Sequence, residues 1–355
     1  MRRPGNPDQS VTFALFAGEG ESANCDCAVH RRLLTVCASF SSGNRTGGMS
    51  SALTRARSPA TVARRDAVTP RSQQVLCQSR SGFHAIAYTE WGDPHAPRVA
   101  VCVHGLTRQG RDFDALAVAL VQRGYRVVCP DLAGRGRSDW LGDPEDYAVP
   151  QYVSDMVTML ARTGAAEIDW IGTSLGGITG IHVAAMEKAP IRRMVVNDIG
   201  PFLPWNALTR LGNYLRALPT SFANFYAAEA YFREILAPFG RLGDTEWFHL
   251  TKHSIAREAD GRFRLLVDPG IGHVFRPVMF YNVSMWRQWD AIRCPVLVLR
   301  GEHSDLLTRD VAYSMTQRGP RAKLVEFPEC GHAPALMDHR QIGTVVHWLT
   351  RDSLG

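Results

Sequence analysis

Short apolar runs rich in β-branched residues alternate with amphipathic segments along most of the chain. The runs that we expect to form strands lie at 98–105, 126–132, 168–174, 193–200, 295–301 and 322–327. Between them, segments such as FDALAVALVQRG place Phe113, Leu116 and Leu120 on one helical face. Strands that are apolar throughout must be buried on both faces, and helices between them supply that cover. We therefore predict an α/β fold with a mostly parallel sheet.

Two further runs precede this series. QVLCQSR and HAIAYTEWG each show strand-like composition, and Ser81-Gly82 between them predicts a hairpin. After the last strand, HRQIGTVVHWL predicts a final helix. The resulting core comprises residues 74–200 and 286–355.

Residues 201–285 interrupt the strand series with a different pattern. ALTRLGNYLRAL and FYAAEAYFREIL carry apolar residues at helical spacing, and prolines punctuate the segment. A helical insertion between two strands would lie over the sheet's carboxyl edge as a lid. We expect its leucines and aromatics to form mainly the lid's own core.

The first 73 residues differ from the rest of the chain. They are rich in Arg, Ser, Ala and Gly, and they show no sustained period, which predicts a disordered or non-catalytic extension. Arg2 and Arg3 before VTFALFAG imitate a signal peptide only weakly, and Met49 is an alternative start. The spacing of Cys25, Cys27 and Cys37 matches no zinc pattern.

Composition and charge limit the binding partners and the location that we expect for the chain. The 355 residues carry a net charge of +6, but the arginines are scattered and form no basic stripe with interleaved aromatics, so no nucleic-acid partner is expected. No apolar run reaches the roughly 18 residues of a membrane span. The eight cysteines suggest no disulfide framework, which favours a reducing, cytoplasmic location. No metal or cofactor is expected, and the oligomeric state is not indicated.

The stretch DWIGTSLGGITG contains the strongest chemical motif. It has no lysine for a phosphate-binding loop, and Ser174 stands where a dinucleotide motif needs glycine. Gly172-Thr173-Ser174-Leu175-Gly176 instead matches G-x-S-x-G between a predicted strand and a predicted helix. Small residues on both sides of the serine let the strand and the helix pass without collision. We therefore predict Ser174 as a nucleophile on a sharp turn.

A serine nucleophile requires a base and an acid. His332, in the loop after the last strand, would emerge at the same sheet edge as Ser174 and is the predicted base. Asp305, in LVLRGEHSDLL after the seventh strand, is the predicted acid, although it could also serve as a helix N-cap. Asp198, at the end of the sixth strand, is a second possible acid.

The same sheet edge offers groups that could stabilise an oxyanion. The backbone N–H of Leu175 at the start of a helix and that of Leu106 after VCVHG are the predicted donors. His104 is interpreted as a support for that loop rather than a base. Arg108 is a candidate for binding a substrate carboxylate, with a local ion pair to Asp112 as the alternative.

These motifs resemble the α/β-hydrolase superfamily. HGLTRQGRDFDALA, PDLAGRGRSDW, GTSLGG, NDIGP, RGEHSDLL and GHAP occur in the order typical of it, over about residues 74–351. The resemblance implies an eight-stranded sheet, a lid between strands six and seven, and a Ser174–Asp305–His332 triad. The motifs are similar to those of bacterial serine esterases and of C–C-bond hydrolases that act on ring-cleavage products. Epoxide hydrolases and haloalkane dehalogenases carry Asp at the position of Ser174, which argues against both reactions.

Three functions follow from this pattern. The first is a serine hydrolase that cleaves a carboxylic ester of small to medium size through an acyl-enzyme. The second is a C–C-bond hydrolase with the same triad. The third is a non-catalytic binder on the same fold. The aromatic-rich lid suits an apolar acyl or alcohol group.

Overall fold

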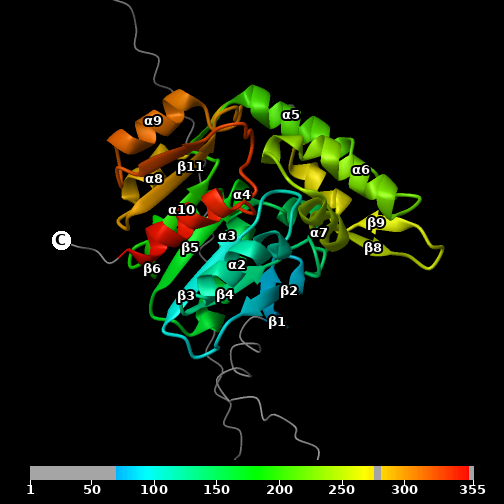
Figure 1. The fold of residues 1–355 in the computed structure, drawn as a ribbon, viewed down its shortest axis with the longest axis horizontal. Helices are drawn as coiled ribbons and strands as arrows, with labels where there is room; N and C mark the ends of the chain where they lie inside the picture. Colours follow the sequence, from blue (N-terminus) through cyan, green and yellow to red (C-terminus); the bar gives the residue numbers. More distant parts are fainter. Residues whose placement is uncertain (1–68, 276–280, 352–355) are drawn as a thin grey trace, which may run out of the picture. The chain divides into compact units, whose positions relative to one another are not determined.

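The computed structural model describes residues 69–275 and 281–351, and its centre is one eight-stranded sheet (Figure 1). The strand order is β1-β2-β4-β3-β5-β6-β11-β12. These strands are β1 (Arg71–Ser79), β2 (Gly82–Trp91), β3 (Arg98–Val103), β4 (Tyr125–Pro130), β5 (Ile168–Thr173), β6 (Ile191–Asn197), β11 (Val296–Gly301) and β12 (Lys323–Phe327). β2 runs antiparallel to β1 and β4, and all the other pairs are parallel. The predicted α/β fold with its eight-stranded sheet is confirmed.

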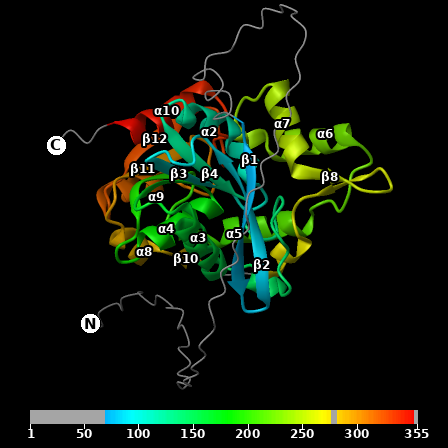
Figure 2. The ribbon, with the colours of Figure 1, turned by 90° about the horizontal axis from the view of Figure 1, so that it is seen from below.

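Helices cover both faces of the sheet (Figure 2). On one face lie α2 (Asp114–Val121) and α10 (His339–Thr350), which contact each other and bury Leu116, Leu120 and Val345. On the other face lie α3 (Val149–Thr163), α4 (Leu175–Ala184), α8 (Trp286–Ala291) and α9 (Arg309–Gln317). The apolar strands thus have hydrophobic cores on both sides, as a parallel sheet requires.

The segment between β6 and α8 is an insertion that leaves and re-enters the core through a short ribbon. β7 (Phe202–Leu203) pairs antiparallel with β10 (Val283–Ser284). Between them come α5 (Trp205–Arg216), α6 (Phe225–Ile235), the 3₁₀ turn η3 (Ala237–Phe239), α7 (Asp244–Ser254), β8 (Ile255–Arg257), β9 (Phe263–Leu265) and η4 (Pro269–Phe275). Figure 1 shows α5, α6 and α7 grouped together beside the sheet. Leu208, Leu215 and Phe232 are buried, in keeping with a core inside the insertion.

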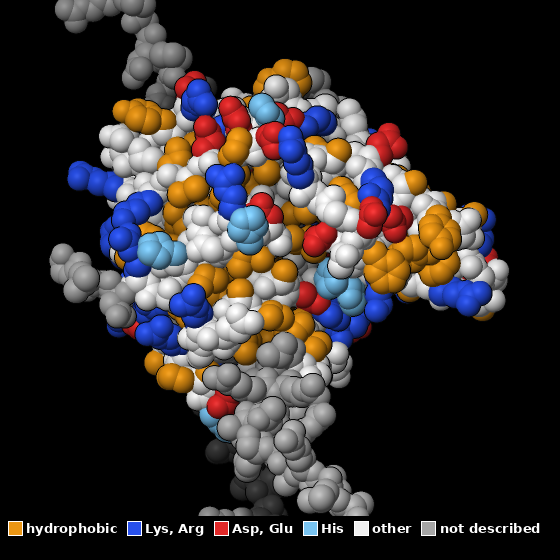
Figure 3. All heavy atoms as spheres, in the orientation of Figure 1, with side chains coloured by type: hydrophobic (Ala, Val, Ile, Leu, Met, Phe, Trp, Pro, Cys, Tyr) orange, Lys and Arg blue, Asp and Glu red, His pale blue; other side chains and the backbone are white. Residues whose placement is uncertain are grey.

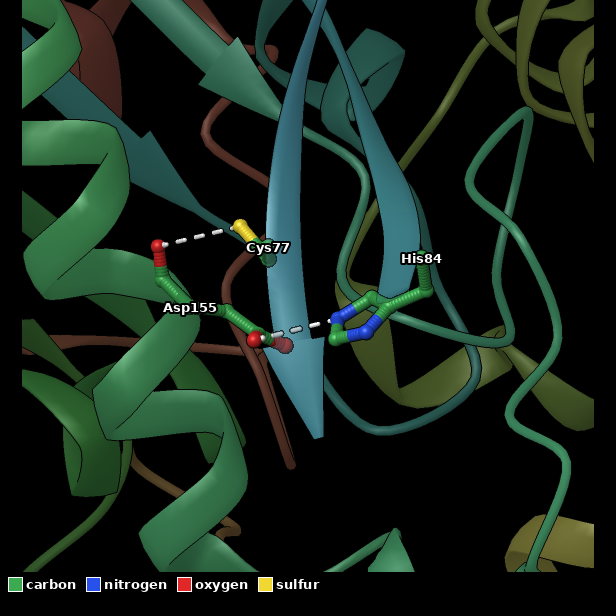
Figure 4. Close-up of side chains that lie close together, drawn as sticks. All are labelled: Cys77, His84 and Asp155. Atoms are coloured by element: carbon green, nitrogen blue, oxygen red, sulfur yellow. Dashed lines mark hydrogen bonds and ion pairs between the residues drawn. The ribbon is translucent and has the colours of Figure 1, made fainter. Parts of the chain in front are cut away.

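A buried polar cluster joins the β1–β2 hairpin to α3 (Figure 4). Cys77 of β1, His84 of β2 and Asp155 of α3 are each at most 3% exposed. His84 Nε2 lies 3.1 Å from Asp155 Oδ1, and the Cys77 thiol donates to the Asp155 carbonyl at 3.9 Å. Gln151 donates to the same carboxylate oxygen at 2.7 Å. These contacts fix the hairpin against the helix.

The surface carries charge of both signs. Figure 3 shows arginine and lysine side chains spread over much of one face, with acidic side chains among them. Hydrophobic side chains are visible where α6 and α7 lie, and Tyr226 and Phe248 of these helices are 81% and 52% exposed. Across residues 69–275 and 281–351, none of the helices has the length and apolar character to cross a membrane. The motifs of the first 68 residues, including Met49 and Cys25, Cys27 and Cys37, lie outside the described residues.

Candidate active site

Ser174 occupies a strained turn between β5 and α4. It follows the last residue of β5 directly and has φ 51° and ψ −114°, in a region that side-chain-bearing residues rarely adopt. A Cβ on Gly172 would lie 2.3 Å from the Gly176 carbonyl oxygen, and a Cβ on Gly176 would lie 2.0 Å from the Val103 oxygen. Both glycines are therefore required for the strand and the helix to approach this closely. The turn presents the Ser174 hydroxyl at the carboxyl edge of the sheet.

A chain of hydrogen bonds runs from Ser174 to a buried carboxylate. His332 Nε2 lies 3.0 Å from Ser174 Oγ, and His332 Nδ1 lies 2.8 Å from Asp198 Oδ2. His332 comes from the loop after β12, as its sequence position predicts. Asp198 directly follows β6, just as Ser174 directly follows β5. Three loops at one sheet edge thus bring a hydroxyl, an imidazole and a carboxylate into line.

Asp305 does not contact His332, and our prediction that it is the acid partner of this histidine is corrected. Its side chain is 54% exposed and forms an ion pair with Arg210 of α5. Asp198 and Asp305 both follow strands of the same edge, so the sequence alone left the two positions open. The side-chain partners distinguish them, because Asp198 bonds to His332 whereas Asp305 pairs with Arg210 of the insertion.

The Asp198 carboxylate is fully buried and held by three donors. The Gly301 N–H donates to Oδ1 at 2.8 Å, and the Ser304 hydroxyl donates to Oδ2 at 2.6 Å, beside His332. A buried carboxylate is tolerated only when such donors compensate for its lost hydration. The loop after β11 therefore supports the acid without supplying it. Ser304 is a site residue that the sequence analysis did not identify.

The loop after β3 lies against the nucleophile. A Cβ on Gly105 would lie 3.5 Å from Ser174 Cβ, and Leu106 lines the cavity above it. Arg135 donates to the Leu106 carbonyl at 2.8 Å, which holds the peptide between Leu106 and Thr107 in place. Leu175 is the first residue of α4, next to Ser174. The positions of Leu106 and Leu175 are compatible with two oxyanion donors, and this role remains a prediction.

His104 supports the same loop from beneath. Its Nε2 accepts a hydrogen bond from the Leu132 N–H at 2.8 Å, and its Nδ1 donates to the Gly105 carbonyl at 2.7 Å. Burial lowers the pKa of His104 to about 3, because a charged imidazole would lose its hydration. The neutral ring is thus a structural brace, and it contacts neither Ser174 nor Asp198.

A cavity of about 430 Å³ opens over Ser174 and His332. Its walls come from the loops after β3, β5, β11 and β12 and from three parts of the insertion: α5, the end of α6, and η3. The lining is mainly apolar, with Leu211, Tyr214 and Phe239 among its side chains. Such a space admits a small organic substrate with its reactive group at Ser174.

Arg108 lies in this cavity wall but is already paired. It donates to the Asp112 carboxylate through Nε at 2.7 Å and through Nη2 at 2.8 Å, and the residue is 6% exposed. Its guanidinium also lies 5.5 Å from the centre of the Phe232 ring. Of the two roles considered for Arg108, the structure shows the ion pair with Asp112, and this pair neutralises the charge that a substrate carboxylate would need. Arg210, which the sequence analysis did not consider, is the exposed guanidinium of the wall.

Two groups of possible metal ligands have their atoms within 4.8 Å of one another in the part of the chain that the structure describes. In the Cys77, His84 and Asp155 cluster, burial raises the pKa of Cys77 to about 12, which disfavours the thiolate that binds metals. In the second group, His249 and His253 approach Asp114, which already forms an ion pair with Arg111. Neither group lines the cavity over Ser174.

Known proteins are similar to this chain in both sequence and fold. The model of the alpha/beta hydrolase family matches residues 100–342. A 3-hydroxybutyrate-oligomer hydrolase of Cupriavidus necator is 46% identical over 290 residues, which cover 79% of this chain and 98% of that protein. A putative hydrolase from Rickettsia typhi superposes with a TM-score of 0.74 at 29% identity, over 80% of this chain and all of that one. An α/β hydrolase from Novosphingobium aromaticivorans gives a TM-score of 0.70 at 33% identity, over 80% of this chain and 99% of that one. On this evidence the chain belongs to the α/β hydrolase family.

Proposed function

We propose that this protein is a serine hydrolase that cleaves carboxylic esters, with short oligomers of 3-hydroxybutyrate or similar hydroxyacids as its substrates. The observation that carries the proposal is the hydrogen-bonded series Ser174–His332–Asp198 at the floor of a cavity. This series supplies a nucleophile, a base and a group that fixes the base's tautomer.

In the first half of the reaction, Ser174 Oγ attacks the ester carbonyl carbon while its proton passes to His332 Nε2. Asp198 accepts the hydrogen bond from His332 Nδ1 and stabilises the imidazolium. The N–H groups of Leu106 and Leu175 are the proposed donors to the oxyanion. The tetrahedral intermediate then expels the alcohol, which takes the proton from His332.

In the second half, water attacks the acyl-Ser174 carbonyl while His332 accepts a proton from it. Collapse of this intermediate releases the acid and returns the proton to Ser174. The segment 201–285 acts as the lid: its α5, α6 and η3 cover the cavity and exclude bulk water from the acyl-enzyme.

The relative of Cupriavidus necator supports the choice of substrate, because its name states hydrolysis of 3-hydroxybutyrate oligomers and it matches over nearly its whole length. A cavity of about 430 Å³ with apolar walls suits chains of a few such units. The C–C-bond hydrolase remains an alternative for the same three groups, and the binder alternative requires that Ser174 be unreactive.

The test compares hydrolysis of 3-hydroxybutyrate dimer and p-nitrophenyl butyrate by the wild type and by Ser174→Ala. We expect both esters to be cleaved by the wild type and the variant to lose roughly 10⁴-fold or more in kcat. A matched control is Ser314→Ala on α9, which removes a serine hydroxyl outside the cavity and should leave turnover unchanged. Unchanged turnover in Ser174→Ala would refute the proposal, and wild-type cleavage of a vinylogous diketone without ester turnover would favour the C–C-bond alternative.

A further inference from the structure

Arg210 and Asp305 form an ion pair across the mouth of the cavity. Arg210 belongs to α5 of the lid, and Asp305 belongs to the loop after β11. Both line the same cavity as Ser174 and His332. The pair therefore belongs to the part of the cavity wall that is exposed to solvent.

This ion pair is open to exchange. The side chains of Arg210 and Asp305 are 53% and 54% exposed, and ion pairs at such exposed positions contribute little to stability because water and salt compete for both partners. A second carboxylate that enters the cavity can therefore replace Asp305 at small cost. Two parallel N–H donors of a guanidinium suit a carboxylate particularly well.

Arg210 differs in this respect from the other basic groups of the cavity wall. Arg108 is buried and engaged by Asp112 through two hydrogen bonds. His332 serves the nucleophile, and the imidazole of His303 lacks the fork of parallel donors that a guanidinium offers. Of the described residues that line the cavity, Arg210 thus offers the lasting positive charge that an anionic substrate can reach.

We propose that Arg210 binds the free carboxylate end of the substrate by exchanging Asp305 for it, an inference that rests on the proposed oligomer hydrolase function. In a 3-hydroxybutyrate oligomer, two carbon atoms, a methine and a methylene, separate the last ester oxygen from the terminal carboxylate carbon. Because Arg210 and Ser174 line the same cavity, we expect a carboxylate bound by Arg210 to direct the last ester bond toward Ser174. The enzyme then removes one hydroxyacid at a time from the carboxyl end.

Asp305 has a defined part in this arrangement. In the absence of substrate it holds the Arg210 side chain at the cavity mouth, where a long side chain would otherwise sample many rotamers. Its negative charge also disfavours an anion that enters without engaging Arg210. The residue predicted as the catalytic acid is thus assigned to substrate selection.

The first experiment compares kcat/KM of wild type, Arg210→Met and Arg216→Met for 3-hydroxybutyrate dimer and for its methyl ester. Arg216 lies on the same helix, bonds to Asn213 outside the cavity, and is the matched control. We expect Arg210→Met to lose about 10- to 100-fold for the acid, mainly through KM, and less than about 3-fold for the methyl ester. Arg216→Met should match the wild type on both.

Two further experiments measure the length of the released products and the inhibition by free 3-hydroxybutyrate. Wild type should convert 3-hydroxybutyrate tetramer to trimer and monomer, whereas Arg210→Met should also release dimer. Free 3-hydroxybutyrate should inhibit p-nitrophenyl butyrate hydrolysis competitively, with an inhibition constant about tenfold higher in Arg210→Met. Circular dichroism spectra of the variants verify that they fold.

Equal losses for acid and methyl ester in Arg210→Met would overturn the inference, since they would indicate a role in lid structure. Unchanged kinetics on both substrates would overturn it as well. If wild type cleaves p-nitrophenyl butyrate but not the dimer, carboxylate recognition fails while ester hydrolysis stands. If Ser174→Ala retains activity, the failure is that of the proposed mechanism instead.

Discussion

Replacement of Asp198 by asparagine tests which carboxylate serves His332. Asp198 Oδ2 accepts from His332 Nδ1 at 2.8 Å and from Ser304, while Oδ1 accepts from Gly301. An asparagine keeps one acceptor oxygen and turns an NH₂ group toward a neighbour. If that NH₂ faces His332 Nδ1, the imidazole must carry its proton on Nε2, which then cannot accept the Ser174 proton.

The loss expected from this wrong tautomer is about 10⁴-fold in kcat, or roughly 5 kcal/mol of transition-state stabilisation. The assay is steady-state hydrolysis of p-nitrophenyl butyrate, a neutral ester that makes no demand on Arg210. The matched control is Asp305→Asn, which should stay within about threefold of wild type because the Asp305 side chain contacts Arg210 and not His332. A large loss in Asp305→Asn together with near-normal turnover in Asp198→Asn would refute the assignment.

Two predictions concern stability. Asp155→Ala should lower the free energy of unfolding by about 3–5 kcal/mol, because it leaves the buried His84 without its partner. Urea titration measures this loss, and Glu167→Ala, at an exposed position, is the control. Equal free energies of unfolding for the two variants would contradict the prediction. Burial lowers the pKa of His104 to about 3, against about 6.5 in an unfolded chain, so the unfolded state binds more protons and stability should fall as pH drops below about 6.5. We expect the free energy of unfolding, measured by urea titration at pH 7.5, 6 and 5, to decline less steeply with falling pH in His104→Gln than in the wild type, by up to about 1.4 kcal/mol per pH unit. Identical slopes for the two proteins would argue against this role of His104.

The sequence predicts those parts of the site that depend on local chain geometry. Gly172 and Gly176 around Ser174 specify a turn that few other functions need, and the structure gives each a close backbone neighbour. His332 could be predicted because it follows the last strand at the same sheet edge. These predictions needed only strand positions and the rule that parallel strands end at one edge.

The acid and the arginine that we propose to bind substrate could not be predicted in the same way. Asp198 and Asp305 follow neighbouring strands, so the rule that parallel strands end at one edge does not separate them. A sequence signal did exist, since Asp198 follows its strand without an intervening residue, exactly as Ser174 does. Arg210 lies on a helix of the insertion, and its distance from the site along the chain gives no hint of which loop it faces. For Arg108 the sequence left two roles open, and the structure shows the one in which it pairs with Asp112.

The five residues from Gly301 to Asp305 contact two different parts of the site. Gly301 and Ser304 hold the Asp198 carboxylate from behind, and Asp305 faces the cavity and the lid. A protein engineer who exchanged this loop to alter substrate preference would also disturb the hydrogen bonds that keep the imidazole oriented. Loop grafts that retain Gly301 and Ser304 should change substrate selectivity with little loss of turnover. Grafts that replace the whole loop should lower turnover as well as change selectivity.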